Sequence, residues 1–76
     1  DHDCRIGDYT HVSPGANLAG GVVVGEGAHL GIGTCAIPGC SIGAWSVVGA
    51  GAAVVRDIPV KCVAVGVPAK VARVLP

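Results

Sequence analysis

The chain has 76 residues, of which 51% are hydrophobic and 13% charged, and its formal net charge is +0 at pH 7. Its few Lys and Arg residues do not cluster, so the sequence predicts neither nucleic-acid binding nor attachment to an anionic membrane surface. No apolar stretch is long enough to cross a bilayer, and the polar start is unlike a signal peptide. The four cysteines have neither a secretory context nor tight zinc spacing, so we expect free thiols in a reducing cytoplasm.

An aliphatic residue returns at every sixth position through most of the chain, and five of the nine following residues are Gly. A period of six fits neither an α-helix nor an isolated strand. It fits a coil in which each hexad forms one short side, with the aliphatic residue inside and the Gly at a corner. The nine aliphatic residues are Ile6, Val12, Leu18, Val24, Leu30, Ala36, Ile42, Val48 and Val54.

The repeat fades after Pro59, and residues 56–59 read as an exit turn. Residues 61–65 are apolar enough to form one last strand. Pro68 suits the first turn of a helix, so we expect a helical turn or two near the C-terminus. Trp45 is expected to pack at a corner or a subunit contact.

This hexad pattern resembles the hexapeptide-repeat acyltransferases. The resemblance implies an all-β fold, a left-handed parallel β-helix with triangular coils of three hexads, at residues 1–59. Residues 60–76 would form a short tail, strand or helix, that packs on the acyl-CoA groove. Because the chain opens inside a repeat and lacks an initiator Met, we expect a fragment of a longer protein.

With three hexads in each coil, residues separated by three hexads lie one above another. His11 and His29 form one such pair, and His2 and Gly20 form another. A potential general base thus lies next to a glycine whose backbone N–H could approach a ligand. Acyl transfer requires this combination, a base for the nucleophile and a donor for the developing oxyanion. For His29, stacking on His11 is the expected role.

The segment from His2 to Gly20 is similar to that of bacterial sugar or sialic acid O-acetyltransferases and UDP-amino-sugar N-acetyltransferases. This resemblance implies that His2 is the general base and that Asp3 holds it. His11 would contact the thioester region of acetyl-CoA, and Gly20 would hold the oxyanion.

The same resemblance implies that the backbones of Ile32 and Ala50 line the acetyl-CoA groove, although relatives often have Gly at the position of Ala50. Lys70, in the tail 66–70, would pair with a CoA phosphate. Acetyl-CoA would be the co-substrate and no metal would be needed. The family further implies a homotrimer, and an N-terminal α/β domain, missing here, that holds a nucleotide-sugar or sialic acid acceptor.

Two alternatives stay open. A γ-type zinc carbonic anhydrase uses the same coil, but it needs two closely spaced histidines, whereas His2, His11 and His29 are widely separated in this sequence. The second alternative is a non-catalytic, trimeric scaffold that binds acyl-CoA. It stays open because His2 lies one residue from the start of the sequence and the acceptor domain is missing. As a fragment, the chain could be an inactive acetyltransferase.

Overall fold

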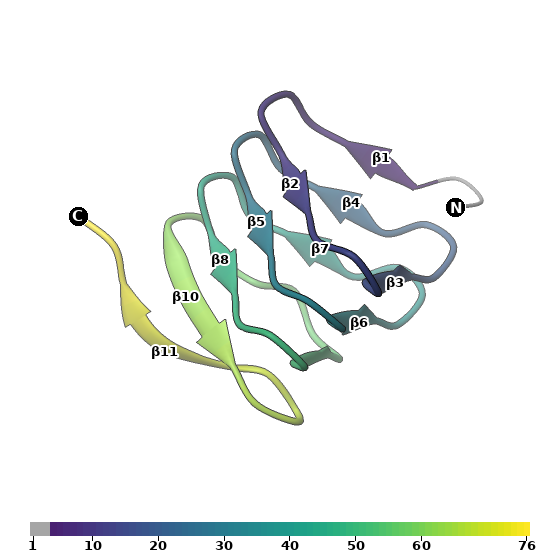
Figure 1. Cartoon of the computed structure of the whole chain (residues 1–76). Coiled ribbons are helices and arrows are strands. Elements are labelled where there is room, and N and C mark those ends of the chain that lie inside the picture. Colours follow the sequence, from purple (N-terminus) through teal and green to yellow (C-terminus); the bar gives the residue numbers. More distant parts are fainter. Residues whose placement is uncertain (1–3) are drawn as a thin grey trace.

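The computed structural model describes residues 4–76 and shows a three-sided solenoid of short strands (Figure 1). Nine strands of two residues each precede two longer ones at the C-terminal end. None of the described residues forms a helix, so this part of the chain contains no helix able to cross a bilayer. The strands are β1 (Arg5–Ile6), β2 (His11–Val12), β3 (Asn17–Leu18), β4 (Val23–Val24), β5 (His29–Leu30), β6 (Cys35–Ala36), β7 (Ser41–Ile42), β8 (Val47–Val48), β9 (Ala53–Val54), β10 (Cys62–Val65) and β11 (Lys70–Val74).

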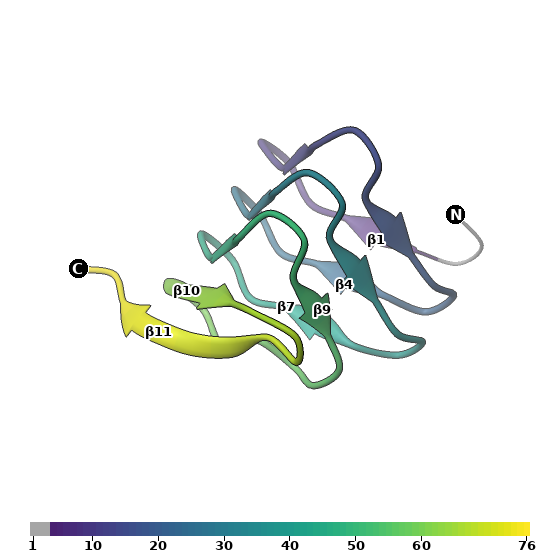
Figure 2. The ribbon, with the colours of Figure 1, turned by 60° about the horizontal axis from the view of Figure 1, so that its bottom comes forward.

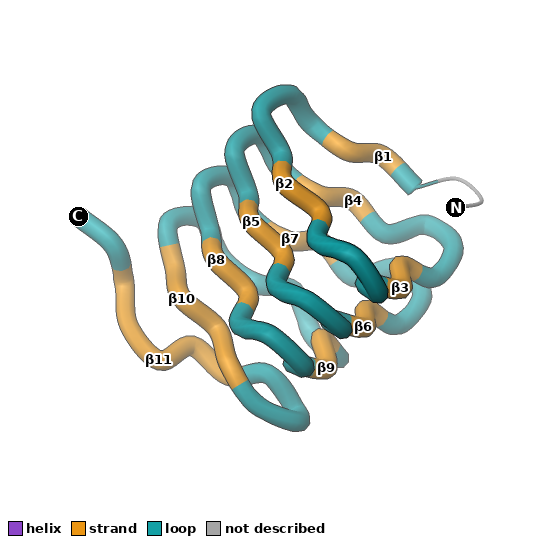
Figure 3. Tube along the Cα trace, in the orientation of Figure 1, coloured by secondary structure: helices purple, strands orange, loops and turns teal. Residues whose placement is uncertain are grey.

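The strands stack into three sheets, one on each side of the solenoid (Figure 3). Their orders are β1-β4-β7, β2-β5-β8-β10-β11 and β3-β6-β9, and every pair between successive coils is parallel. Arg5 pairs with Val23 and His11 with His29, which in each case is a step of three hexads. The expected coil of three hexads is therefore confirmed, and the fold is the expected left-handed parallel β-helix.

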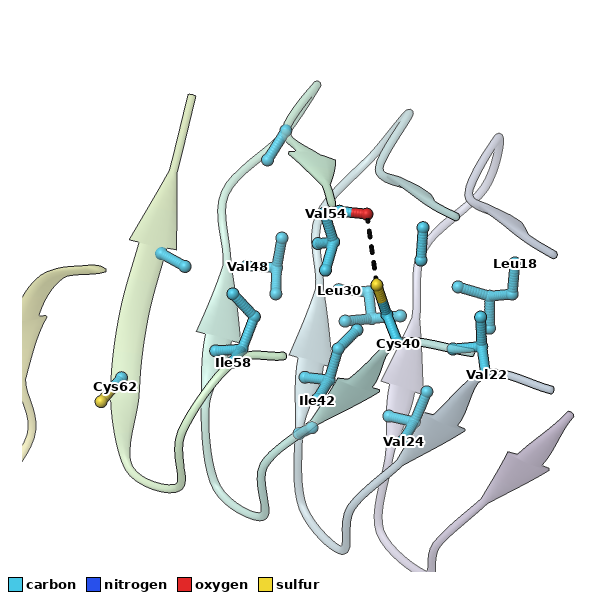
Figure 4. Packing of buried hydrophobic residues seen from close by; sticks show 14 residues of the cluster. Leu18, Val22, Val24, Leu30, Cys40, Ile42, Val48, Val54, Ile58 and Cys62 are labelled. Atoms are coloured by element: carbon cyan, nitrogen blue, oxygen red, sulfur yellow. Dashed lines mark hydrogen bonds between the residues drawn. The ribbon is translucent and has the colours of Figure 1, made fainter. Parts of the chain in front are cut away.

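The core is a narrow aliphatic column along the axis (Figure 4). The repeated aliphatic residues from Leu18 to Val54 are all buried, as the hexad register predicted. Ile6 and Val12 are the exception, with 50% and 37% of their surface exposed, because no other described segment covers the outer side of their coil at these two positions. Small or β-branched residues fill the core positions between these aliphatic residues, and these are Val22, Ala28, Thr34, Cys40, Ser46 and Ala52.

The fully buried hydroxyls of Thr34 and Ser46 are hydrogen-bonded, which offsets the cost of placing them in an apolar column. Thr34 Oγ1 donates to the carbonyl oxygen of Gly31 at 2.7 Å. Ser46 Oγ donates to the carbonyl oxygen of Pro59 at 2.5 Å and accepts from the Cys62 N–H at 3.1 Å. Ser46 therefore ties the exit turn to the start of β10.

The corners explain the repeated glycines. A side chain at Gly31 would place its Cβ 2.6 Å from the backbone nitrogen of Ala50, so successive coils could not approach as they do. At another corner the Trp45 ring lies against Gly27, where an added Cβ would clash with the ring. Trp45 itself adopts a left-handed φ of 61°, which is uncommon for a bulky residue. The expectation that Trp45 packs at a corner is thus confirmed.

The C-terminal segment differs from the expected helical turn. The strand predicted near residues 61–65 is β10, which adds to the sheet beside β8 in parallel. The chain then reverses and β11 pairs with β10 antiparallel (Figure 2). The prediction of a helix after Pro68 was therefore wrong. β10 has a free edge whose backbone groups need partners, and an antiparallel strand satisfies them whereas a helical turn would not.

We expect Val48→Asp to unfold the chain. Val48 is fully buried, and an unpaired carboxylate there should lower the free energy of unfolding by at least about 4 kcal/mol. Val23→Asp is the matched control, because Val23 points outward with 42% of its surface exposed and should change stability by about 1 kcal/mol or less. Thermal melts followed by circular dichroism measure both, and equal melting points would contradict the register.

Candidate functional site

Two imidazole rings stack on the outer face of one sheet. His11 in β2 and His29 in β5 are register partners, as their spacing predicted. Their ring centroids are 4.6 Å apart and the ring planes differ by 14°. Both side chains are exposed, and Val47 continues the same column on β8. The two histidines therefore form a short polar column near the N-terminal end of the solenoid.

This geometry does not suit a shared metal ion. The nitrogen lone pairs of an imidazole lie in its ring plane, so two nearly parallel stacked rings direct them side by side and not toward one point. Among the described residues, no three His, Cys, Asp or Glu side chains come close enough to hold a metal. A three-histidine zinc centre would thus need ligands from outside this part of the chain.

One corner brings Ile32 and Ala50 together, as their separation by three hexads required. The Gly51 N–H donates to the Ile32 carbonyl oxygen at 2.7 Å, which places the two residues on adjacent coils. Ile32 is 64% exposed and Ala50 is also exposed. Within residues 4–76, neither the Ile32 N–H nor the Ala50 N–H donates to another backbone group. This corner therefore presents an apolar side chain and two available donors.

Gly20 lies at a different corner, between β3 and β4. The turn is closed by the Val22 N–H, which donates to the Ala19 carbonyl at 3.3 Å, and the Gly20 carbonyl accepts from Gly39 at 3.1 Å. The Gly20 N–H donates to no backbone acceptor within the described range. Its predicted neighbours His2 and Asp3 lie outside the described residues, so their places remain predictions.

Lys70 lies at the C-terminal end, beside an open pocket of about 640 Å³. The pocket is formed by the exit turn after β9 and the start of β11. Asp57 on its wall accepts a hydrogen bond from the Ser41 N–H at 2.9 Å, which holds one carboxylate oxygen. Arg56 adds a second cation that the sequence analysis missed, because a lone charge in a turn carries no pattern. The lining residues are Val55, Arg56, Asp57, Ile58, Pro59, Pro68, Ala69, Lys70 and Val71.

The predicted donor-site residues therefore lie on several elements of one chain. Ile32 and Ala50 share a corner, and His11 lies on the sheet that runs into that corner. Lys70 lies beyond them toward the C-terminal end. The sheet that contains β3 lies between Gly20 and this group. Within a single chain, Gly20 is therefore at a different corner of the solenoid from Ile32 and Ala50.

The four cysteines are all free, as expected. Cys35 points outward from β6 and is exposed, whereas Cys40 and Cys62 are buried. Burial raises the pKa of the Cys40 thiol, and the negative charge of Asp57 adds to that rise. A buried thiol with a raised pKa is a poor nucleophile, which argues against a covalent role for Cys40.

No protein-family model matches the chain. Among solved structures, a histidine variant of perosamine N-acetyltransferase from Caulobacter crescentus, in complex with CoA and GDP-perosamine, is 55% identical with a TM-score of 0.92. The match covers 93% of this chain and 34% of the perosamine N-acetyltransferase chain. The acetyltransferase domain of PglB from Neisseria gonorrhoeae, in complex with acetyl coenzyme A, is 41% identical with a TM-score of 0.92, covering 93% of this chain and 35% of that one.

Among curated sequences, the Saccharomyces cerevisiae protein YJL218W, provisionally assigned as an acetyltransferase, is 46% identical over 77 residues. The match covers 91% of this chain and 39% of the yeast protein. The chain thus spans somewhat over a third of the length of these relatives.

We expect Cys35 to react with iodoacetamide at pH 7 at least about tenfold faster than Cys40 in the folded chain, because Cys40 is buried and its pKa is raised. Raising the pH should increase Cys40 labelling, since more of that thiol then ionises. Mass spectrometry of peptides measures both sites. Denaturant should make all four cysteines reactive, and rapid labelling of Cys40 without it would contradict the packing.

Proposed function

This chain is a hexapeptide-repeat β-helix of the sugar acetyltransferase type, and from that premise we propose that it forms the acyl-CoA-binding part of an acetyl-CoA-dependent sugar acetyltransferase. The observation that carries the proposal is the likeness, over 93% of this chain, to a perosamine N-acetyltransferase solved with CoA and its nucleotide sugar. The acceptor we propose is the amino group of a nucleotide-linked sugar.

The donor would lie along the corner that Ile32 and Ala50 share. Pantetheine is an extended, mostly apolar arm with amide groups, so it fits a strip that offers an apolar side chain and free backbone donors. The exposed Ile32 side chain supplies the apolar contact, and the N–H groups of Ile32 and Ala50 supply the donors. His11, on the adjacent sheet face, would meet the thioester end.

The phosphates of the coenzyme would lie toward the C-terminal pocket. Lys70 and Arg56 line it together with Asp57, whose carboxylate accepts a hydrogen bond from the Ser41 N–H, so the lining has a net positive charge that suits an anionic group. Charge-assisted hydrogen bonds to phosphate are among the stronger polar contacts that a protein surface can make. This arrangement supports the orientation of CoA with its nucleotide end at the tail.

The chemistry would be direct transfer. His2 would take a proton from the acceptor amine while the nitrogen attacks the thioester carbonyl carbon. The oxyanion that forms would accept a hydrogen bond from the N–H of Gly20, and collapse would expel the CoA thiolate, which takes up the proton held by His2. Asp3 would hold the His2 ring and favour its protonated form. The nitrogen is acetylated and no covalent enzyme intermediate is formed.

In the full-length parent protein, we expect His2→Ala to lower kcat by about 10²–10⁴-fold and leave acetyl-CoA affinity almost unchanged, because a general base acts mainly in the transition state. His11→Ala should instead raise the KM for acetyl-CoA. Steady-state kinetics with GDP-perosamine, together with calorimetry of acetyl-CoA binding, separate the two effects. Near-normal kcat with lost acetyl-CoA binding in His2→Ala would place His2 in the donor site and contradict the assignment. Acetyl-CoA binding without turnover by the unaltered chain would instead favour the non-catalytic scaffold.

We further propose a homotrimer located in the cytoplasm. A solenoid this small buries little surface, and it exposes large apolar side chains such as Ile32, Ile37 and Val71. Because Gly20 and the Ile32 corner lie on different edges of one chain, a neighbouring copy could bring them together. The free cysteines fit a reducing compartment.

Sedimentation equilibrium at micromolar concentration should give a mass three times that of the 7.4 kDa chain. The apolar edges should drive this association, since they remain exposed in the single chain. Replacing Ile32 with Lys should shift the population toward monomer, and replacing the exposed Arg5 with Lys should not. A stable monomer for the unaltered chain would contradict the trimer and leave acetyl-CoA binding to be tested separately.

A further inference from the structure

The imidazole of His11 has little support from the rest of its own coil. β2 is the last strand of its sheet in the described chain, and the neighbouring Val12 is 37% exposed although it points inward. Within residues 4–76 the His11 ring makes no hydrogen bond, and it stacks on the ring of His29. The orientation of the His11 ring in this part of the chain thus depends on one neighbour.

Backbone hydrogen bonds hold His29 firmly in place. The His11 N–H donates to the Ala28 carbonyl at 2.9 Å, and the His29 N–H donates to the Ser46 carbonyl at 2.9 Å. These bonds lock β2 to β5 and β5 to β8, so the two Cα atoms cannot slide past one another. His29 has a strand on each side, and Val47 follows it in the column. The His29 ring is therefore better supported than the His11 ring that stacks on it.

A ring held at 4.6 Å and within 14° of parallel can rotate only by losing the stack. We propose that His29 is a positioning residue, whose imidazole holds the ring of His11 in the orientation that meets the acyl donor. The role rests on the proposed function, in which His11 contacts acetyl-CoA. His29 acts through His11 and need not touch the coenzyme.

Two substitutions separate stacking from the other properties of His29. His29→Ala removes the stack, whereas His29→Phe keeps a flat ring on the same strand and removes the ring nitrogens. Val23→Ala is the matched control, because it shortens another exposed, outward side chain on a neighbouring sheet. Circular dichroism melts check that all the variants remain folded.

The first measurement needs no coenzyme. Carbon–proton NMR spectra of the His11 ring should show averaged side-chain couplings and shifted ring signals in His29→Ala. Val23→Ala should leave these signals at their original positions. His29→Phe should restore the couplings of a single side-chain rotamer, although the signals themselves will move because a different ring lies beneath.

The second measurement is calorimetric titration with acetyl-CoA. His29→Ala should weaken binding by about 2- to 10-fold, the range expected for the loss of one aromatic pair. His29→Phe should recover affinity to within about twofold of the unaltered chain. Unchanged His11 couplings in His29→Ala would overturn the proposal, and so would equal weakening by Ala and Phe, because His29 would then bind the coenzyme directly.

His11→Ala distinguishes failure of this inference from failure of the proposed function. If His11→Ala leaves acetyl-CoA affinity unchanged, the donor-site role of His11 is wrong, and the positioning role falls with it even if the NMR couplings respond. If His11→Ala weakens binding and His29→Ala does not, the donor site stands and the positioning role is overturned.

Discussion

Hydrogen bonds between the backbones of successive coils hold every turn of this chain to the next. Each strand of the first nine has only two residues, so no strand could be stable alone, and the ladder of parallel pairs supplies the order. The ladder also sets how close successive coils lie, about 4.8 Å as in other sheets. That spacing explains why Gly31 has no room for a side chain and why the interior admits only a narrow column of aliphatic and small residues.

The same spacing organises the surface. A residue that points outward on one coil has its register partner directly on the next, so exposed side chains form columns along the sheets and corners. His11 and His29 make one column, and Ile32 and Ala50 make another. A ligand that runs along the solenoid meets groups at regular intervals, which suits an extended molecule better than a compact one. The functional proposals depend on this linear arrangement.

The two ends of the solenoid differ in how they meet solvent. At the C-terminal end, β10 and β11 pair with one another and cover the last coil, and Cys62 and Ala64 are buried there. At the other end of the described chain, Ile6 and Val12 remain exposed although their sequence positions belong to the core. Leu18 belongs to the same coil and is nevertheless buried, with Cys4 packed beside it, so the core register and the burial of a given residue are separate properties.

The sequence by itself determined the parts of the structure that repeat. The hexads fixed which residues point inward from Leu18 to Val54, and the family's three-hexad coil placed His11 on His29 and Ile32 beside Ala50. These predictions succeeded because each rests on the same local signal met many times. His2 and Asp3, known from a motif alone, remain predictions outside the described residues.

Only the tertiary structure decided what happens where the repeat ends. Pro68 favoured a helix locally, but the free edge of β10 captured residues 70–74 as a strand. The Trp45 ring packs against Gly27, and Arg56 and Lys70 line one pocket. Neither contact could be predicted from the hexad repeat. Such contacts join segments that differ in composition, and their outcome depends on which backbone groups and surfaces remain unpaired once the coils have formed.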